Sequence, residues 1–253
     1  MAWKDELDNA KKIFKTGTLK EKLEYIFDYY KWHILILIFV IYAIGNIIYT
    51  NVTAKESVLQ GIFLNTIVEE SSSLELEQEF LAKYPIDSSS EEIFFDTSLY
   101  YVSDADSTYS ETSHQTIQVL SVRIAAGEID FVVSDLENIY TLVYNQYFFE
   151  LPEVLNKKQL EKYEPYFLYY DKALLEELNN IDFTEKKQPE IVYPDPSKPE
   201  LMKDPVPILI DIDTSERLSG IYPNSYLDYG MAFVVNSANT EKSLEFLDFL
   251  NLS

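Results

Sequence analysis

The chain contains no cysteine, two histidines (His33 and His114) and two arginines (Arg123 and Arg217). The absence of cysteine excludes a disulfide scaffold, cysteine-ligated zinc, an iron–sulfur cluster and a thiol nucleophile. Two histidines leave little for a histidine-based metal site or a catalytic base. We therefore expect no metal ion, no cofactor and no enzymatic activity.

Basic residues are scarce, since 20 Lys and Arg stand against 43 Asp and Glu, which gives a net charge of −23. Nucleic acid is not expected as a partner, because a phosphate backbone is bound by a surplus of Lys and Arg. Hydrophobic residues still make up 47% of the 253 residues. This composition differs from that of a disordered acidic tail and allows a sizeable core in one or two domains.

One long segment lacks charged side chains. No Lys, Arg, Asp or Glu occurs from Trp32 to Ala54, and residues 32–49 read WHILILIFVIYAIGNIIY. As a helix this run is about 27 Å long, close to the thickness of a hydrocarbon core. A signal peptide is the alternative, but the run begins late, is too long and lacks a small-x-small cleavage site. We therefore predict a transmembrane helix at residues 32–50, with aromatic residues at its two membrane interfaces, namely Tyr29, Tyr30, Trp32 and Tyr49.

The lysines beside this segment predict its orientation. Residues 1–31 carry seven lysines, whereas only Lys55 follows soon after the apolar run. Because Lys and Arg stay on the cytoplasmic side, the N-terminus is expected inside and the C-terminal part outside. The sequence thus predicts a single-pass protein of the cell membrane, with the lipid bilayer as a partner. Its three parts are a cytoplasmic juxtamembrane segment (1–31), the transmembrane helix (32–50) and an extracytoplasmic domain (55–253).

The juxtamembrane segment has a helical pattern of its own. Thr18 followed by Glu21 is a capping box. The apolar residues after it share one helical face, and these are Leu19, Leu23, Ile26, Phe27 and Tyr30. This face can pack on the membrane domain of a partner or lie against lipid headgroups. A helix that simply continues into the membrane explains it equally well.

The extracytoplasmic domain alternates strand-like and helical patterns. Strands are expected at residues 58–64, 92–102, 129–133, 208–212 and 231–235. Helices are expected at residues 74–83, 113–126 (ended by Gly127), 137–148 and 240–250. Residues 151–180 read as helical pieces, and the proline-rich stretch 188–207 as an ordered loop. The fold class is therefore α/β, with a parallel or mixed sheet covered on both faces.

Three segments resemble extracellular solute-binding proteins of the type 2 periplasmic-binding fold. They are AAGEIDFVVSD (Ala125–Asp135), YFFELPEVL (Tyr147–Leu155) and GMAFVVNSANTEKSLEFLDFL (Gly230–Leu250). The flank YYKWHILI at residues 29–36 is similar to small single-span membrane proteins of Gram-positive bacteria that carry such a domain. The chain departs from the family by having an apolar helix in place of a lipoprotein cysteine. Its domain of about 200 residues is also smaller than the usual two-lobed binders.

The resemblance implies a membrane-anchored binding module outside the cell, accessory to an ABC transporter or another membrane protein. The alternative is an interaction protein that keeps the fold without a ligand and docks on a membrane complex. A third, distant possibility comes from ILIDIDTS at residues 208–215, because a strand ending in Asp-x-Asp resembles the phosphatase motif of the haloacid dehalogenase fold. Only 38 residues follow Ser215, and no later acidic pair follows a strand, so Asp211 and Asp213 are better explained as a strand end.

The domain's composition favours a cationic or neutral solute. Two arginines are few for a domain that recognises carboxylate or phosphate groups. In addition, no tryptophan follows Trp32. Carboxylates beside tyrosine rings suit cations. In open α/β sheets ligands bind beyond the carboxyl ends of strands. The candidate ligand-binding residues are therefore Asn65, Thr66, Ser134, Asp135, Asn236 and Ser237 at strand ends, with Tyr222, Asn224, Tyr226 and Tyr229 in an aromatic loop.

Overall fold

The structure is a computed structural model, and it describes residues 10–66, 70–103, 110–181, 191–222 and 227–252. The chain divides into two compact units, Met1–Ala54 and Lys55–Ser253. The first unit contains the 35-residue helix α2 (Leu19–Thr53), preceded by a short helical segment at residues 10–16. The predicted capping box is confirmed, because Thr18 Oγ1 accepts a hydrogen bond from the N–H of Glu21, and the Glu21 carboxylate accepts one from the N–H of Thr18.

The apolar part of α2 is long enough to cross a membrane. The candidate span is Tyr30–Thr50, and no part of it is buried within the protein. A helix of this length near the N-terminus fits both a single-pass membrane anchor and a signal sequence. Tyr30 and Trp32 are exposed at one end of the span and Tyr49 at the other. The side chain of Tyr29 lies outside the described part of the structure.

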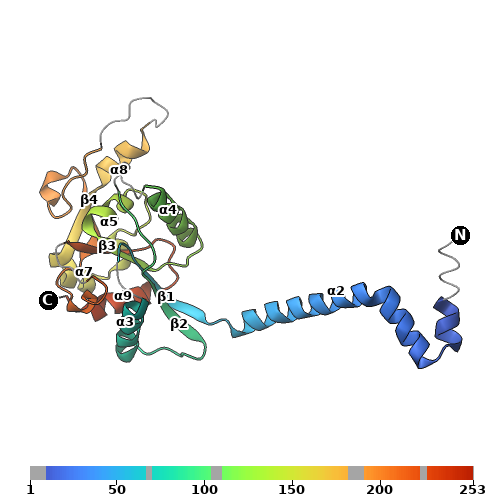
Figure 1. Cartoon of the computed structure of the whole chain (residues 1–253). Helices are drawn as coiled ribbons and strands as arrows, with labels where there is room; N and C mark the ends of the chain where they lie inside the picture. The colour runs from blue at the N-terminus through green and yellow to red at the C-terminus, as the bar shows by residue number, and fades with distance from the viewer. Residues whose placement is uncertain (1–9, 67–69, 104–109, 182–190, 223–226, 253) are drawn as a thin grey trace. The chain divides into compact units, whose positions relative to one another are not determined.

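The second unit contains a mixed six-stranded sheet (Figure 1). The strands are β1 (Glu56–Phe63), β2 (Glu91–Asp96), β3 (Phe131–Asp135), β4 (Phe167–Asp171), β5 (Pro205–Asp211) and β6 (Tyr229–Phe233). Their order in the sheet is β2-β1-β3-β6-β5-β4. The first three strands are mutually parallel, whereas β6 is antiparallel to both β3 and β5, and β4 is antiparallel to β5.

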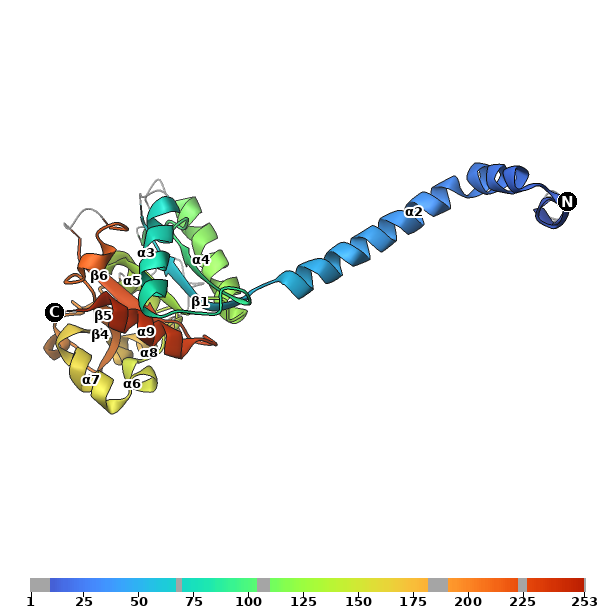
Figure 2. The same ribbon diagram turned by 90° about the horizontal axis from the view of Figure 1, so that it is seen from below.

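Helices cover both faces of the sheet (Figure 2). One face packs against α3 (Glu70–Lys83), α6 (Leu151–Val154), α7 (Lys157–Tyr163) and α9 (Thr240–Leu250). The other packs against α4 (Ser110–Ala125), α5 (Leu136–Val143) and α8 (Lys172–Asn179). The expected mixed α/β architecture is therefore confirmed.

Each sheet face has its own hydrophobic core because successive side chains of a strand point to opposite faces. On β3, Phe131 and Val133 belong to the first core and Val132 to the second. Phenylalanines dominate the first core, where the ring of Phe131 stacks on that of Phe246 with centroids 4.5 Å apart. Phe63, Phe80 and Phe95 surround this pair with tilted or edge-on rings.

Five strands and four long helices were expected near their observed positions, but several bounds were wrong. The strand expected at 92–102 ends at Asp96, because the Asp96 carboxylate accepts hydrogen bonds from the N–H (2.9 Å) and hydroxyl (2.6 Å) of Ser98 and turns the chain. The helix expected at 137–148 ends at Val143. Within the region expected to be helical, β4 forms a strand because it pairs with β5.

Residues 188–190 of the proline-rich stretch lie outside the described residues, and the described part ends earlier than predicted. Residues 191–204 lie outside the sheet and include a short 3₁₀ helix, Pro199–Leu201, but β5 already begins at Pro205. Proline is tolerated at the first position of a strand and at irregular positions of a ladder, where no N–H is needed. Pro207 fits that rule, because it pairs with Tyr169 where the register of β4 and β5 shifts.

Candidate functional site

Six of the ten candidate ligand-binding residues gather at one edge of the sheet. The carboxyl ends of β1, β2, β3 and β5 meet at this edge, and β6 begins there. We call it the carboxyl edge. Its candidate residues are Asn65, Thr66, Ser134, Asp135, Tyr222 and Tyr229.

The carboxylate of Asp135 is the centre of a buried polar network. Its Oδ2 accepts hydrogen bonds from Asn65 Nδ2 (2.7 Å) and the Ser134 hydroxyl (3.1 Å). Its Oδ1 accepts from the N–H (3.1 Å) and the side-chain amide (2.8 Å) of Asn138, which makes Asp135 the N-cap of α5. Asn65 Oδ1 also accepts from the N–H of Tyr101 at 2.8 Å. These contacts join β1, β3 and α5, so Asn65, Ser134 and Asp135 already bond to one another.

Two tyrosines complete the edge. The rings of Tyr222 and Tyr229 stack with centroids 4.1 Å apart. The buried hydroxyl of Tyr222 lies 2.9 Å from the carbonyl oxygen of Leu64 and 3.2 Å from that of Val133, so it bridges the ends of β1 and β3. Burial raises the pKa of Tyr222 well above its usual value, and the phenol therefore stays protonated.

Thr66 joins the carboxyl ends of β1 and β2, because its hydroxyl donates to the carbonyl of Thr97 at 2.9 Å. Asn224 and Tyr226 lie outside the described residues. Asn236 and Ser237 follow β6, and because β6 runs antiparallel to its neighbours they lie at the opposite edge of the sheet. Asn236 Nδ2 donates to the last carbonyls of α4, those of Ile124 and Ala125.

Ser237 belongs to a second buried network, centred on Asp130. The Asp130 carboxylate is 1% exposed and accepts hydrogen bonds from the Ser237 hydroxyl (2.6 Å) and the N–H of Gln60 (2.7 Å). Asn239 Nδ2 lies 3.4 Å from the same carboxylate. This network links β1 and β3 to the turn between β6 and α9.

Replacing Asp130 tests this structural role. We expect Asp130→Ala to lower the free energy of unfolding by about 2 kcal/mol, because it leaves the N–H of Gln60 and the hydroxyl of Ser237 without their charged acceptor. Urea denaturation of residues 55–253 measures the change. Glu128→Ala is the control, since Glu128 is an exposed acid two residues away. Equal stability of the two variants would contradict this role.

A hollow of about 580 Å³ lies beside the carboxyl edge. This volume is within the usual range for small-molecule sites. Its walls come from the start of α5, the segment 193–196 and the residues before β6, and they include Asp135, Glu137, Tyr140, Thr141, Tyr193, Asp195, Leu227 and Asp228. The twelve residues that line it include four acids and two tyrosines but no Lys or Arg.

The tyrosines of the hollow are held by their neighbours. The ring of Tyr193 lies 6.3 Å from that of Tyr140 and 4.8 Å from that of Tyr144. The segment that carries Tyr193 is positioned by the N–H of Tyr169 in β4, which donates to the carbonyl of Pro196 at 2.8 Å. Burial raises the pKa of Tyr140, Tyr144 and Tyr193, so the rings are neutral phenols.

The acids of the hollow differ in how far their charge is neutralised. Asp195 has its pKa lowered to about 2 by hydrogen bonds from Lys198 Nζ and from Ser197, so a lysine already neutralises it. Glu137 and Asp228 are exposed. A second hollow of about 270 Å³, lined by Tyr222 and Tyr229, shares Asp228 with the first. The hollows thus present a negative, aromatic surface.

One member of the Asp-x-Asp pair, Asp213, lines the second hollow. Asp211 ends β5, and its Oδ1 accepts from the N–H of Asp213 at 3.0 Å. Partial loss of solvent, with Asp211 and Asp228 nearby, raises the pKa of Asp213 to about 6. Over the described ranges of the chain, no three His, Asp or Glu side chains form a group suited to a metal ion.

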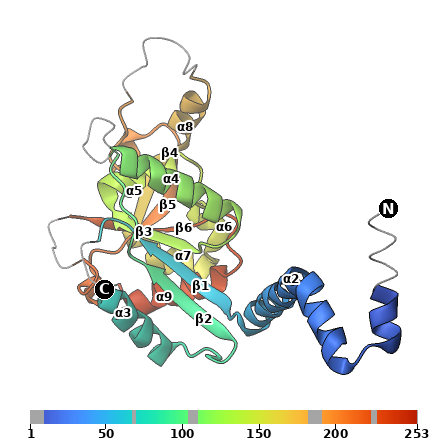
Figure 3. The same ribbon diagram turned by 45° about the vertical axis from the view of Figure 1, so that its right-hand side comes forward.

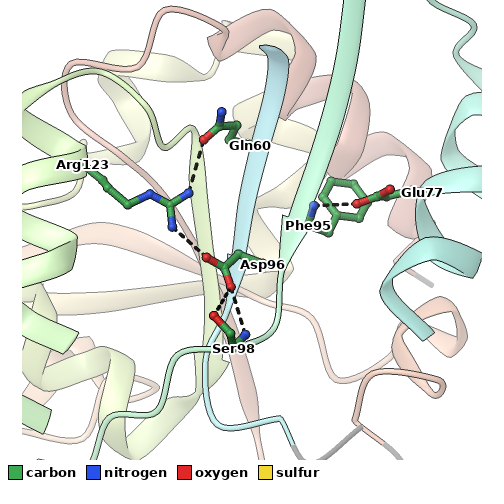
Figure 4. A network of polar contacts seen from close by, with 6 residues as sticks. All are labelled: Gln60, Glu77, Phe95, Asp96, Ser98 and Arg123. Atoms are coloured by element: carbon green, nitrogen blue, oxygen red, sulfur yellow. Dashed lines mark hydrogen bonds and ion pairs between the residues drawn. The ribbon is translucent and has the colours of Figure 1, made fainter. Parts of the chain in front are cut away.

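Both arginines are engaged in internal contacts. Arg123 on α4 forms an ion pair with Asp96 (2.7 Å) and donates to Gln60 Oε1 (3.3 Å) (Figure 4). Arg217 contacts Glu79 at 3.2 Å, and its guanidinium lies 4.4 Å from the ring centroid of Phe249. Neither guanidinium lines the hollow beside the carboxyl edge.

Sequence reasoning missed Tyr140, Tyr193 and Asp228 as residues of this hollow. Tyr193 lies in the stretch YPDP, whose two prolines restrict the backbone, and this was the available signal for an ordered aromatic wall. Tyr140 gave no signal, because a tyrosine on an amphipathic helix is usually part of the core. Comparison with known proteins adds no further residues, because no protein-family model, curated protein or solved structure matches the chain.

Proposed function

We propose that the chain is a single-pass, membrane-anchored binding module whose extracytoplasmic domain takes a small cationic solute, with a neutral solute as the weaker fit. The observation that carries the proposal is the hollow beside the carboxyl edge, where Tyr140 and Tyr193 lie near Glu137 and Asp228 without any basic lining residue. Carboxylates attract an ammonium group by charge, and tyrosine faces attract it through cation–π contact. An anion would meet repulsion here.

The fold is compatible with one lobe of a solute-binding protein. In the sheet order β2-β1-β3, the strand that precedes Asn65 (β1) and the strand that ends at Asp135 (β3) are neighbours, and their ends meet at the point where the order reverses. Ligands in open α/β sheets bind at such points. The strands described in the second unit all belong to one sheet. The proposed site is therefore an open hollow at the edge of that sheet. A transporter partner stays a prediction from the resemblance.

A titration of the full chain in detergent micelles tests the proposal. Choline, spermidine and arginine serve as cationic probes, glucose as a neutral probe and succinate as an anionic one. A ligand at 100 times its dissociation constant adds about 2.7 kcal/mol to the stability, which raises the melting temperature by a few degrees. We expect this shift with at least one cation and none with succinate.

Two variants localise the binding. We expect Asp228→Asn and Tyr193→Leu each to lower the affinity for the cation about fivefold. The first removes a carboxylate from the hollow and the second removes an aromatic face. Glu128→Gln removes one negative charge at the other end of the sheet and should leave the affinity unchanged. A cation that binds all three variants equally would contradict the site.

The second candidate function is a ligand-free docking module. It is favoured by the internal hydrogen bonds of Asn65, Ser134 and Asp135, which leave few polar groups converging on the hollow. A folded chain that responds to none of the probes would support this function over the first.

A further inference from the structure

The N-terminal part of α2 carries an apolar stripe outside the candidate membrane span. Leu19, Leu23, Phe27 and Tyr30 are between 47% and 81% exposed. At about 100° per residue these four side chains fall on one side of the helix. We call this set the juxtamembrane stripe. It continues into the apolar span that begins at Tyr30.

Charged residues are sorted around this stripe. On the helical projection Lys20 lies along one border, where it pairs with Glu24, and Lys22 lies along the other border. Glu21 and Asp28 lie on the far side. Glu21 is further occupied by the capping box with Thr18. A helix with an apolar stripe bordered by lysines, and with acids on its far side, is typical of segments that lie in a membrane interface.

The preceding helical segment adds more positive charge to the N-terminal side of the span. The ring of Phe14 packs edge-on against that of Tyr25, with centroids 5.9 Å apart, so residues 10–16 lie against the side of α2 opposite the stripe. Lys11, Lys12 and Lys15 of this segment are exposed. Residues 10–31 together hold six lysines and three acids, a positive balance in a strongly negative chain.

The helix α2 is bent, so its N-terminal part does not run in the direction of the candidate span. Figures 1 and 3 show α2 bent, with its N-terminal part angled against its long apolar part. A straight continuation along the membrane normal would carry Leu19 about 16 Å beyond the start of the span, past the headgroups. A bend lets the juxtamembrane stripe stay within the headgroup layer.

We propose that residues 19–31 form an interfacial segment whose juxtamembrane stripe lies in the headgroup layer of an anionic membrane leaflet, with the bordering Lys20 and Lys22 on anionic lipid headgroups. Each lysine near such a surface strengthens membrane attraction by about fivefold. The occupant is lipid because the lysines border the stripe on both sides, as snorkelling side chains do. This inference depends on the membrane anchor of the proposed function, but not on its solute.

Spin labels on the full chain in lipid vesicles test the inference. Because the chain has no cysteine, single labels are introduced at Leu23→Cys on the stripe, at Asp28→Cys on the far side and at Ile38→Cys in the span. Collisions with oxygen and with a water-soluble nickel chelate report the depth of each label. The vesicles contain equal parts of phosphatidylcholine and phosphatidylglycerol. We expect the ratio of oxygen collisions to nickel-chelate collisions to be several-fold higher for the label at 23 than for the label at 28.

Salt and charge variants identify the lipid chemistry. The label at 23 should move toward water in vesicles of pure phosphatidylcholine. It should do the same in about 0.5 M NaCl, because this salt concentration shortens the Debye length to roughly 4 Å. Lys20→Gln should act in the same direction. Lys157→Gln is its matched control, because both lysines form an exposed i,i+4 pair with a glutamate.

Three outcomes would decide against the inference. A label at 23 that stays in water in anionic vesicles, while the label at 38 lies in the bilayer, overturns the interfacial segment alone. A label at 23 shielded from both reagents overturns it in favour of a protein partner. A label at 38 in water overturns the membrane anchor itself, and with it this part of the proposed function.

Discussion

Replacing Phe246 by alanine is expected to lower the free energy of unfolding of residues 55–253 by about 4 kcal/mol. The side chain is fully buried on α9, and its ring stacks on that of Phe131. It also contacts the rings of Phe63, Phe95 and Phe80. The destabilisation has two causes, namely the lost burial of the ring and the cavity that the surrounding rings cannot close. It is a large share of the total stability of a typical domain.

Urea denaturation followed by circular dichroism measures this loss, and Phe94→Ala is its control. Phe94 lies on β2 but is 48% exposed, so its removal should cost less than about 1 kcal/mol. If the two variants lost the same stability, the phenylalanine cluster would not be the main core of this sheet face.

Gly61→Ala is the second change with a large expected effect. Gly61 lies in β1 directly opposite Phe131 of β3, and a Cβ at this position would come within 2.1 Å of the Phe131 ring. That ring is held between other rings and is fully buried, so it has no room to move. We expect a destabilisation of about 3 kcal/mol, at the upper end of overpacking costs, or failure to fold.

A control and a second background make this prediction specific. Gly220→Ala should be neutral or slightly stabilising, because no atom lies within 4 Å of its added Cβ. In a Phe131→Leu background the same Gly61→Ala change should cost clearly less, since the obstructing ring is gone. An equal cost in both backgrounds would show that the clash with Phe131 is not the cause.

Local sequence patterns predicted most elements of the fold because their causes are local. The uncharged run from Trp32 to Ala54 predicted the long apolar helix, and Thr18 with Glu21 predicted where α2 begins. Gly127 marked the end of α4, where it adopts a φ of +71° that glycine accommodates. Alternation of strands and helices predicted an α/β sheet covered on both faces.

The candidate site depended on pairing between distant strands. The sequence shows that Asn236 and Ser237 follow a strand, but not that β6 runs antiparallel between β3 and β5 and carries them to the opposite edge. Residues 167–171 (FLYYD) are rich in aromatic residues, as strands are, but they fall in the region that was expected to be helical, and their pairing with β5 is what makes them a strand. Strand direction and neighbours follow from long-range hydrogen bonds, which one segment does not encode.

By itself, therefore, the sequence determined the acidic charge, the lack of thiol chemistry, the long apolar helix and the α/β class, because each follows from composition or from short-range periodicity. Only the tertiary structure decided which polar residues meet. It placed Asn65 on Asp135, buried Ser237 on Asp130 and brought Tyr193 to Tyr140 beside an acidic hollow. The physical reason is that these contacts join segments between 53 and 107 residues apart in the chain, and only the packing of the sheet and its helices brings such segments together.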